Sequence, residues 1–238
     1  MTNARNAPRA RSLGDEQLIE AMAHTGCPMC RHVAAVAPRY LDSLLYQHTT
    51  DRAYRDRFIK GGGFCARHVG AAVRADSAGN GDGVGAAIFI RSQLAARGRA
   101  LQGASGFRAG KRIREATRPA WHCPVCENEV TASESAAVRL VEHSAADEAW
   151  REQVESSAWC LTHLGHVLAA AAEAGGSTLD GLRTRQLDLM SDLDGRLEAL
   201  AHDSSHGRRD RLTAEVRSSL QEAADVLAGG GGPEDAAD

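Results

Sequence analysis

The sequence is poor in aromatic residues and lacks any long apolar run. Only ten of the 238 residues are Phe, Tyr or Trp. The apolar content therefore comes mostly from Ala, Leu and Val, a composition that favours helices over sheets. No stretch of about 18 apolar residues occurs that could span a membrane. Because no apolar segment follows the arginines of residues 1–11, a secretory signal is not expected either. We therefore expect a cytoplasmic protein with no membrane partner.

Other patterns are absent as well. No alternation of apolar and polar residues marks a strand, which predicts an all-α fold. The formal net charge of −3 argues against a general nucleic-acid-binding protein. No Gly-x-Ser-x-Gly motif or other sign of a nucleophilic triad occurs. The sequence thus gives no support for enzyme activity, and it favours a binding or regulatory protein with an unknown protein partner.

The sequence does contain an internal repeat. A shift of 96 residues superimposes Cys27–Cys30 on Cys123–Cys126, and both strings read Cys-Pro-x-Cys. After one deletion, Phe64–His68 meets Trp159–His163, and both strings contain Cys-x-x-His. All six cysteines and one histidine of each half fall on this repeat. The pattern therefore predicts two structural repeats in tandem.

Apolar spacing predicts three helices in each repeat. In the first repeat they lie at about 33–45, 52–58 and 65–74, with Thr50-Asp51 as the N-cap of the second helix. The second repeat echoes this pattern at 131–143, 146–154 and 160–172. Between the repeats we expect a helix over 86–101 and a loop over 103–120. The expected organisation is an N-terminal segment (1–24), the first repeat (25–76), a linker with a basic helix (77–120), the second repeat (121–173), C-terminal helices (174–228) and a disordered tail (229–238).

The repeated Cys and His residues form a pattern typical of metal ligands. In each repeat, 34 or 33 residues separate the Cys-x-x-Cys from the Cys-x-x-His. Three thiolates and one imidazole match a structural zinc site, and four protein donors leave no open position for catalysis. We therefore expect two zinc ions per chain, one in each repeat. The predicted ligands are Cys27, Cys30, Cys65 and His68 in the first repeat, and Cys123, Cys126, Cys160 and His163 in the second.

Two alternatives concern these sites. An iron–sulfur cluster also uses cysteine ligands and would make the chain a redox protein or an enzyme. In addition, His166 and His122 lie next to predicted ligands and could replace them. The repeat argues against both histidines, because Ala71 and Gly26 occupy the equivalent positions.

The linker contains a strongly basic segment. Residues 91–118 hold seven Arg and Lys111 against one acid, Glu115, a net charge of +7 that leaves −10 for the rest of the chain. Such a segment is a candidate site for an anionic ligand or a nucleic acid. We favour a solvated helix and linker docked on acidic surface of the same molecule, because aromatic residues do not interleave with the cations.

Three strings, Gly26–Cys30, Arg39–Tyr46 and Gly63–His68, resemble an uncharacterised bacterial family. Its members carry CPxC, a YLxxLLY helix and a GFCxxH segment, followed by a second CPxC…CxxH half. The resemblance covers most of residues 25–170 and is looser in the second half, where Ala136-Ala137 replaces the Tyr-Leu pair. It implies a helical, metal-binding protein and supplies no reaction.

Overall fold

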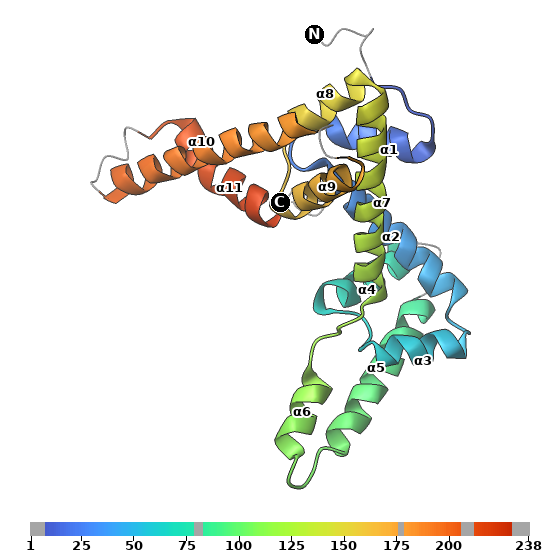
Figure 1. The fold of residues 1–238 in the computed structure, drawn as a ribbon. Coiled ribbons are helices and arrows are strands. Elements are labelled where there is room, and N and C mark those ends of the chain that lie inside the picture. Colours follow the sequence, from blue (N-terminus) through green and yellow to red (C-terminus); the bar gives the residue numbers. More distant parts are fainter. Residues whose placement is uncertain (1–7, 79–82, 176–178, 206–211, 230–238) are drawn as a thin grey trace. The chain divides into compact units, whose positions relative to one another are not determined.

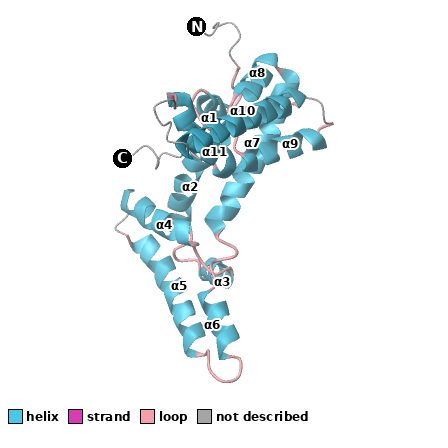
Figure 2. Cartoon of the chain, turned by 90° about the vertical axis from the view of Figure 1, so that its left-hand side faces the viewer, coloured by secondary structure: helices cyan, strands magenta, loops and turns pink. Residues whose placement is uncertain are grey.

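The chain folds into helices, and the part that the structure describes contains no strand (Figures 1 and 2). The structure is a computed structural model that describes residues 8–78, 83–175, 179–205 and 212–229. The predicted all-α class is confirmed. The helices are α1 (Leu13–Met22), α2 (Pro28–Gln47), α3 (Arg52–Lys60), α4 (Ala66–Ala78), α5 (Val84–Gln102), α6 (Ala109–Thr117), α7 (Pro124–Ala146), α8 (Glu148–Ser156), α9 (Leu161–Glu173), α10 (Asp180–Ser205) and α11 (Ala214–Ala228). Among the described residues, no helix combines the length and the apolar character that a membrane crossing needs.

The helices form two compact units. The first unit comprises residues 1–34 and 132–238, and the second comprises residues 35–131. The division passes through α2 and α7, so each of these long helices contributes to both units. Each unit consequently takes its elements from both halves of the sequence.

The core of the first unit surrounds Trp150 and Trp159, which are both almost completely buried. The indole N–H of Trp159 donates a hydrogen bond to the carbonyl of Val154 at 2.9 Å. The Trp159 carbonyl accepts a hydrogen bond from the side chain of Gln186 in α10 at 3.0 Å. These bonds fix the backbone immediately before Cys160, one of the predicted metal ligands.

Helix α1 lies in the segment for which the sequence predicted no element. Its Asp15 is 2% exposed, and its carboxylate accepts hydrogen bonds from Nε2 of His143 at 3.0 Å and from the backbone N–H of Arg11 at 2.9 Å. Burial alone would raise the pKa of Asp15, but the hydrogen bonds outweigh burial and lower it. Because His143 belongs to α7, this buried pair ties α1 to the first unit.

The expected C-terminal helices are present as α10 and α11, which lie side by side (Figures 1 and 2). Arg196 of α10 pairs with Glu222 of α11 at 2.7 Å. Helix α11 ends at Gly229, whose φ of 79° is favourable only for glycine. The tail predicted from residue 229 onward otherwise lies outside the described residues.

The second unit holds the triple-glycine segment, Gly61–Gly63, in a tight turn after α3. The N–H of Gly63 donates to the carbonyl of Phe58 at 2.9 Å. The side chain of Gln93 in α5 accepts from the N–H of Phe64 and donates to its carbonyl, both at 3.0 Å. Helix α5 therefore fixes the backbone immediately before Cys65.

The prediction of a loop over 103–120 is wrong, because this range contains α6. No side chain caps the start of α6, so the local signal for a helix is weak. Packing against α5 supplies what the local sequence lacks. Ala116 is buried, and the guanidinium of Arg97 in α5 donates to the carbonyls of Ala116 and Arg118 at 2.8 and 2.6 Å.

Replacing Gln93 tests whether α5 fixes the backbone at Phe64. Gln93→Ala leaves the partly buried N–H and carbonyl of Phe64 without this partner, so we expect the free energy of unfolding to fall by about 1–3 kcal/mol. Urea unfolding monitored by circular dichroism measures the change. Gln102→Ala is the control, because Gln102 is exposed on the same helix. Equal effects of the two substitutions would contradict the assignment.

Candidate metal centres

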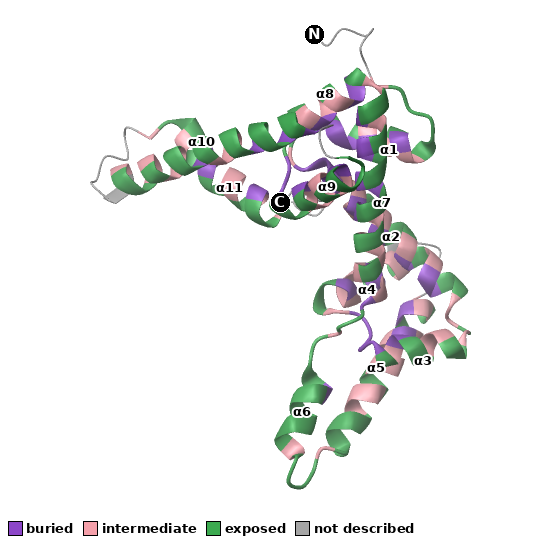
Figure 3. Ribbon diagram, in the orientation of Figure 1, coloured by how far each residue is buried: buried purple, intermediate pink, exposed green. Residues whose placement is uncertain are grey.

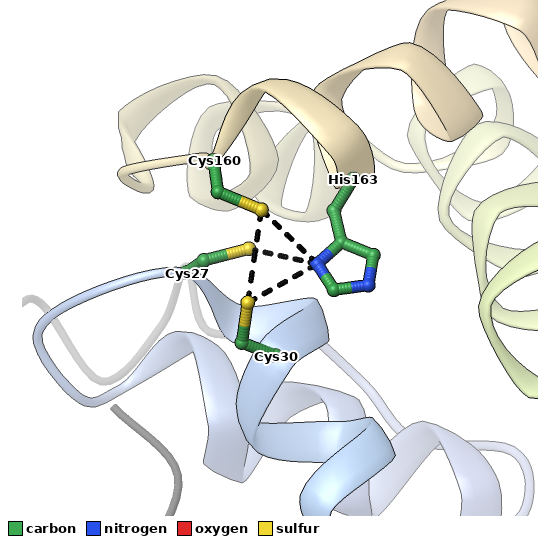
Figure 4. A group of neighbouring side chains, drawn as sticks. All are labelled: Cys27, Cys30, Cys160 and His163. Carbon is green, nitrogen blue, oxygen red and sulfur yellow. Dashed lines mark hydrogen bonds between the residues drawn. The ribbon is translucent and has the colours of Figure 1, made fainter. Parts of the chain in front are cut away.

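The structure gathers the predicted ligands into two groups of four. The first metal group consists of Cys27, Cys30, Cys160 and His163 (Figure 4). Nδ1 of His163 lies 3.5 Å from Sγ of Cys27 and 3.2 Å from Sγ of both Cys30 and Cys160. The sulfurs of Cys30 and Cys160 are 3.7 Å apart. The four donor atoms thus surround one point.

The second metal group consists of Cys65, His68, Cys123 and Cys126. Nδ1 of His68 lies 3.4, 3.5 and 3.3 Å from the sulfurs of Cys65, Cys123 and Cys126. The sulfurs of Cys65 and Cys126 are 3.7 Å apart. All six cysteines of the two groups are free of disulfides.

The prediction that each repeat completes its own group is wrong. The CPxC pair of the first repeat meets the CxxH pair of the second, and the CPxC pair of the second meets the CxxH pair of the first. The two sites are therefore not arranged in tandem. All eight predicted residues remain in the two groups, with their partners exchanged.

Helix length explains the exchange. The CPxC pair begins α2, whose 20 residues carry the chain about 30 Å. The return helix α3 has nine residues and covers only about 14 Å. The triple-glycine segment after α3 is a tight turn and does not supply the missing length. The same mismatch recurs between α7, with 23 residues, and α8, with nine.

Every ligand lies at the N-terminal end of a helix. Cys27, Cys65, Cys123 and Cys160 each precede a helix, and their carbonyls accept the first helical hydrogen bonds. The other four ligands lie in the first turns of the same helices. Two helix N-termini thus meet at each group, α2 with α9 and α4 with α7. Their positive dipole ends favour the thiolate form that a metal requires.

The distances suit one tetrahedral ion in each group. Zinc bonds of about 2.3 Å to sulfur and about 2.0–2.1 Å to nitrogen give tetrahedron edges of about 3.8 Å between sulfurs and about 3.6 Å between sulfur and nitrogen. The separations in the structure, 3.7 Å between sulfurs and 3.2–3.5 Å between sulfur and nitrogen, are close to these edges. All donor atoms of a group lie within 4.8 Å of one another. Each group can therefore hold a single ion.

The pKa values of the ligands in each group also favour metal binding. Burial would raise the pKa of Cys123, but the hydrogen bond with His68 lowers it to about 6. Burial would lower the pKa of His68, but the hydrogen bonds with Cys123 and Glu129 raise it to about 9. In the first group, hydrogen bonds with the other two thiols lower the pKa of Cys160. Burial would lower the pKa of His163, but hydrogen bonds with Cys160 and Cys27 raise it to about 9. In each group the surroundings therefore favour a thiolate beside the histidine, and thiolate is the form in which cysteine binds a metal.

The residues behind the two histidines differ between the groups. Nε2 of His68 lies 3.2 Å from Oε1 of Glu129, a carboxylate that also pairs with Arg67. The ring donates its Nε2 proton to Glu129 and leaves the Nδ1 lone pair for a metal, as in carboxylate–histidine–zinc triads. His163 instead has its Nε2 3.4 Å from the hydroxyl of Ser133. The second group therefore has the stronger support.

The backbone of Gly229 covers part of the first group. A Cβ atom added to Gly229 would lie 2.8 Å from Sγ of Cys30 and 3.4 Å from Sγ of Cys160. The backbone that follows α11 thus packs directly on two ligand sulfurs. Only glycine fits this place, because a side chain would collide with the sulfurs and the φ of 79° disfavours other residues.

The sequence pattern identifies the ligands but not the residues that support them. Glu129 follows Cys126 by three residues and so lies one helical turn along α7, a spacing that could have found it. Gly229 gave no local signal. The two competing histidines lie outside both groups, as the repeat predicted. His122 pairs with Glu127 at 2.9 Å, and the ring of His166 is 6.1 Å from that of His163.

Paired substitutions distinguish the exchanged arrangement from a tandem one. Cys27→Ser with Cys160→Ser removes two ligands from one group and leaves the other complete, so we expect one tightly held metal ion. Cys27→Ser with Cys65→Ser removes one ligand from each group and should leave no complete site. Native mass spectrometry after dialysis against a mild chelator counts the ions. A tandem arrangement requires the reverse result for the two variants.

Removing Glu129 tests the support behind His68. In the variant that lacks Cys27 and Cys160, only the second group remains to be titrated. There, Glu129→Ala should lower the metal affinity by about 10–100-fold, because an oriented imidazole is the better ligand. Competition with a chelating dye measures the change. Ser133→Ala in the same background is the control, since Ser133 supports the other group, and an equal loss there would contradict the assignment.

No family model matches the chain, and neither a curated protein nor a solved structure matches it.

Proposed function

We propose that this chain is a helical binding or regulatory protein whose two halves are held together by two structural zinc ions. The observation that carries the proposal is the exchange of ligand pairs between the repeats. Because each group takes two ligands from each half of the sequence, each ion would bridge segments that lie far apart along the chain.

The donor geometry supports a single ion rather than an iron–sulfur cluster. A cluster distributes its cysteine ligands over several iron atoms, which separates the ligands from one another. Here all four donors of each group lie within 4.8 Å. A site of three thiolates and one imidazole at tetrahedral spacing is typical of structural zinc.

The ligand set also supports a structural role over a catalytic one. A catalytic zinc keeps one position for water or substrate, whereas four protein donors fill a tetrahedral ion. At the first group, Gly229 adds backbone cover over two of the sulfurs. We therefore assign the function to the surface that the metal-bound fold presents rather than to chemistry at the metal.

Two further parts of the proposal rest on the cysteines and on the repeat. We place the protein in the cytoplasm, a compartment in which thiols stay reduced, and the six disulfide-free cysteines support this. We also assign it to the bacterial family that its CPxC and GFCxxH strings resemble.

Metal removal tests the structural role. Each structural zinc contributes folding free energy on the order of 10 kcal/mol in small domains. Complete removal by a strong chelator under reducing conditions should therefore lower the helicity and the melting temperature markedly, and adding zinc should restore both. Elemental analysis verifies the removal. Unchanged circular dichroism and melting temperature in the metal-free chain would overturn the proposal and favour thiol or redox chemistry.

Loss of one ligand should act on one unit. Cys65→Ser should release the ion of the second group alone, because Cys65 belongs only to that group. We expect hydrogen exchange to accelerate in α4 and at the start of α7, while α9 in the first unit keeps its protection. If hydrogen exchange in α9 accelerates as much as in α4, the two groups are not independent.

A further inference from the structure

The basic segment of the linker forms a largely exposed helical hairpin. We call residues 91–118 the basic hairpin; it contains most of α5, the connection 103–108 and α6. The two helices pack on each other. Between residues 101 and 115, every residue except Ala104 and Ala109 is exposed (Figure 3).

The cations of the basic hairpin are not neutralised within the second unit. Among the described residues, Arg91, Arg99, Arg108 and Arg114 have no carboxylate partner, and only Lys111 forms an ion pair, at 3.8 Å with Glu115. The sequence favoured docking on acidic surface of the same molecule, and such docking is not observed among the described residues of the second unit. Seven of the eight cations, all but Arg97, are exposed, so this surface favours a negatively charged partner.

Apolar side chains are exposed beside these cations. Phe107 is fully exposed in the connection between the two helices, and Leu94 is 67% exposed on α5. Leu101 lies seven residues after Leu94, on the same face of the helix, and it is exposed too, as is Ile113 on α6. A partner must therefore accept apolar groups as well as positive charge.

We propose that the basic hairpin docks on an anionic lipid bilayer surface, with Phe107 inserted at the boundary between headgroups and acyl chains. Helices that lie in this boundary have apolar side chains such as Phe and Leu on one face and a polar face rich in Lys or Arg. Helix α5 contains no Asp or Glu at all. Lipid phosphates attract the unpaired arginines, and the acyl boundary accepts Phe107 and the leucines.

Other partners match these features less well. A nucleic acid would attract the cations and could stack on Phe107, but it offers no apolar partner to Leu94, Leu101 and Ile113. A second copy of the hairpin carries the same positive charge and would be repelled. The sequence expectation of no membrane partner rested on spanning segments alone, and surface docking needs none.

The proposal goes beyond the zinc-bridged fold and is tested on the full, metal-loaded chain. Sedimentation with vesicles of equal parts phosphatidylcholine and phosphatidylglycerol should capture the protein, and vesicles of phosphatidylcholine alone should not. Capture should weaken as salt is added, because salt screens the charges. Metal content and melting temperature, measured for every variant, separate a failure of docking from a failure of the zinc-bridged fold.

Two variants and two matched controls locate the contact. Phe107→Ser should weaken vesicle binding at least about tenfold, because the phenyl ring that inserts into the bilayer is lost. Tyr46→Ser is the control and should leave vesicle binding unchanged, since Tyr46 is an aromatic residue that is 88% exposed in the same unit but outside the hairpin. Arg108→Glu with Arg114→Glu should abolish binding. Arg39→Glu with Arg52→Glu makes the same change in net charge outside the hairpin, and this variant should retain most of the vesicle binding.

Three results would overturn the proposal. The first is failure of the native chain to bind the anionic vesicles. The second is binding that the hairpin variants leave unchanged. The third is binding to a single-stranded oligonucleotide that the Arg108 and Arg114 substitutions abolish, without any binding to vesicles, since this would assign the hairpin to nucleic acid instead.

Discussion

A single metal ion needs four donors around one point, and this chain gathers them only by joining its two halves. Each CPxC pair starts a long helix, α2 or α7, that carries the chain away from its own group. The donors that complete the group then come from the other repeat, with sulfurs in contact across 130 residues in the first group and 61 in the second. Closing such long loops costs entropy that grows only slowly with loop length, so one ion can offset it. Because of the exchange, each group depends on residues of both repeats.

The repeat preserves the ligands but not their surroundings. The position one turn after CPxC is Glu129 in the second repeat and Val33 in the first, where the valine is buried in the core. One group therefore has a carboxylate behind its histidine, and the other has the hydroxyl of Ser133. The first group is instead covered by the backbone of Gly229, which comes from the far end of the chain. Identical donor sets can thus differ in affinity and in access, because the outer residues set both.

The sequence was sufficient for features that depend on local spacing. It predicted the helical class, the Asp51 N-cap of α3 and the eight residues of the two groups. It could not predict which pairs meet, because Cys-x-x-Cys and Cys-x-x-His spacings fit either pairing and only the relative lengths of α2 and α3 decide. It missed α6, which lacks a capping side chain and depends on packing against α5. It also missed the role of Gly229, because a close approach of backbone to sulfur leaves no periodic pattern in the sequence.

The second metal group and the basic hairpin share their supports. Gln93 and Arg97 of α5 both bond to the carbonyl of Gly62, at 3.2 and 3.0 Å, just before the first ligand of that group. In the segment between α6 and α7, the N–H groups of Trp121 and His122 both donate to the carbonyl of Gly61 at 3.1 Å, just before Cys123. Both ends of the hairpin are therefore fixed to the same glycine turn, between two segments that one ion would join. A hairpin with few buried residues of its own gains a defined base in this way, because its hydrogen bonds end on the glycine turn that precedes the ligands.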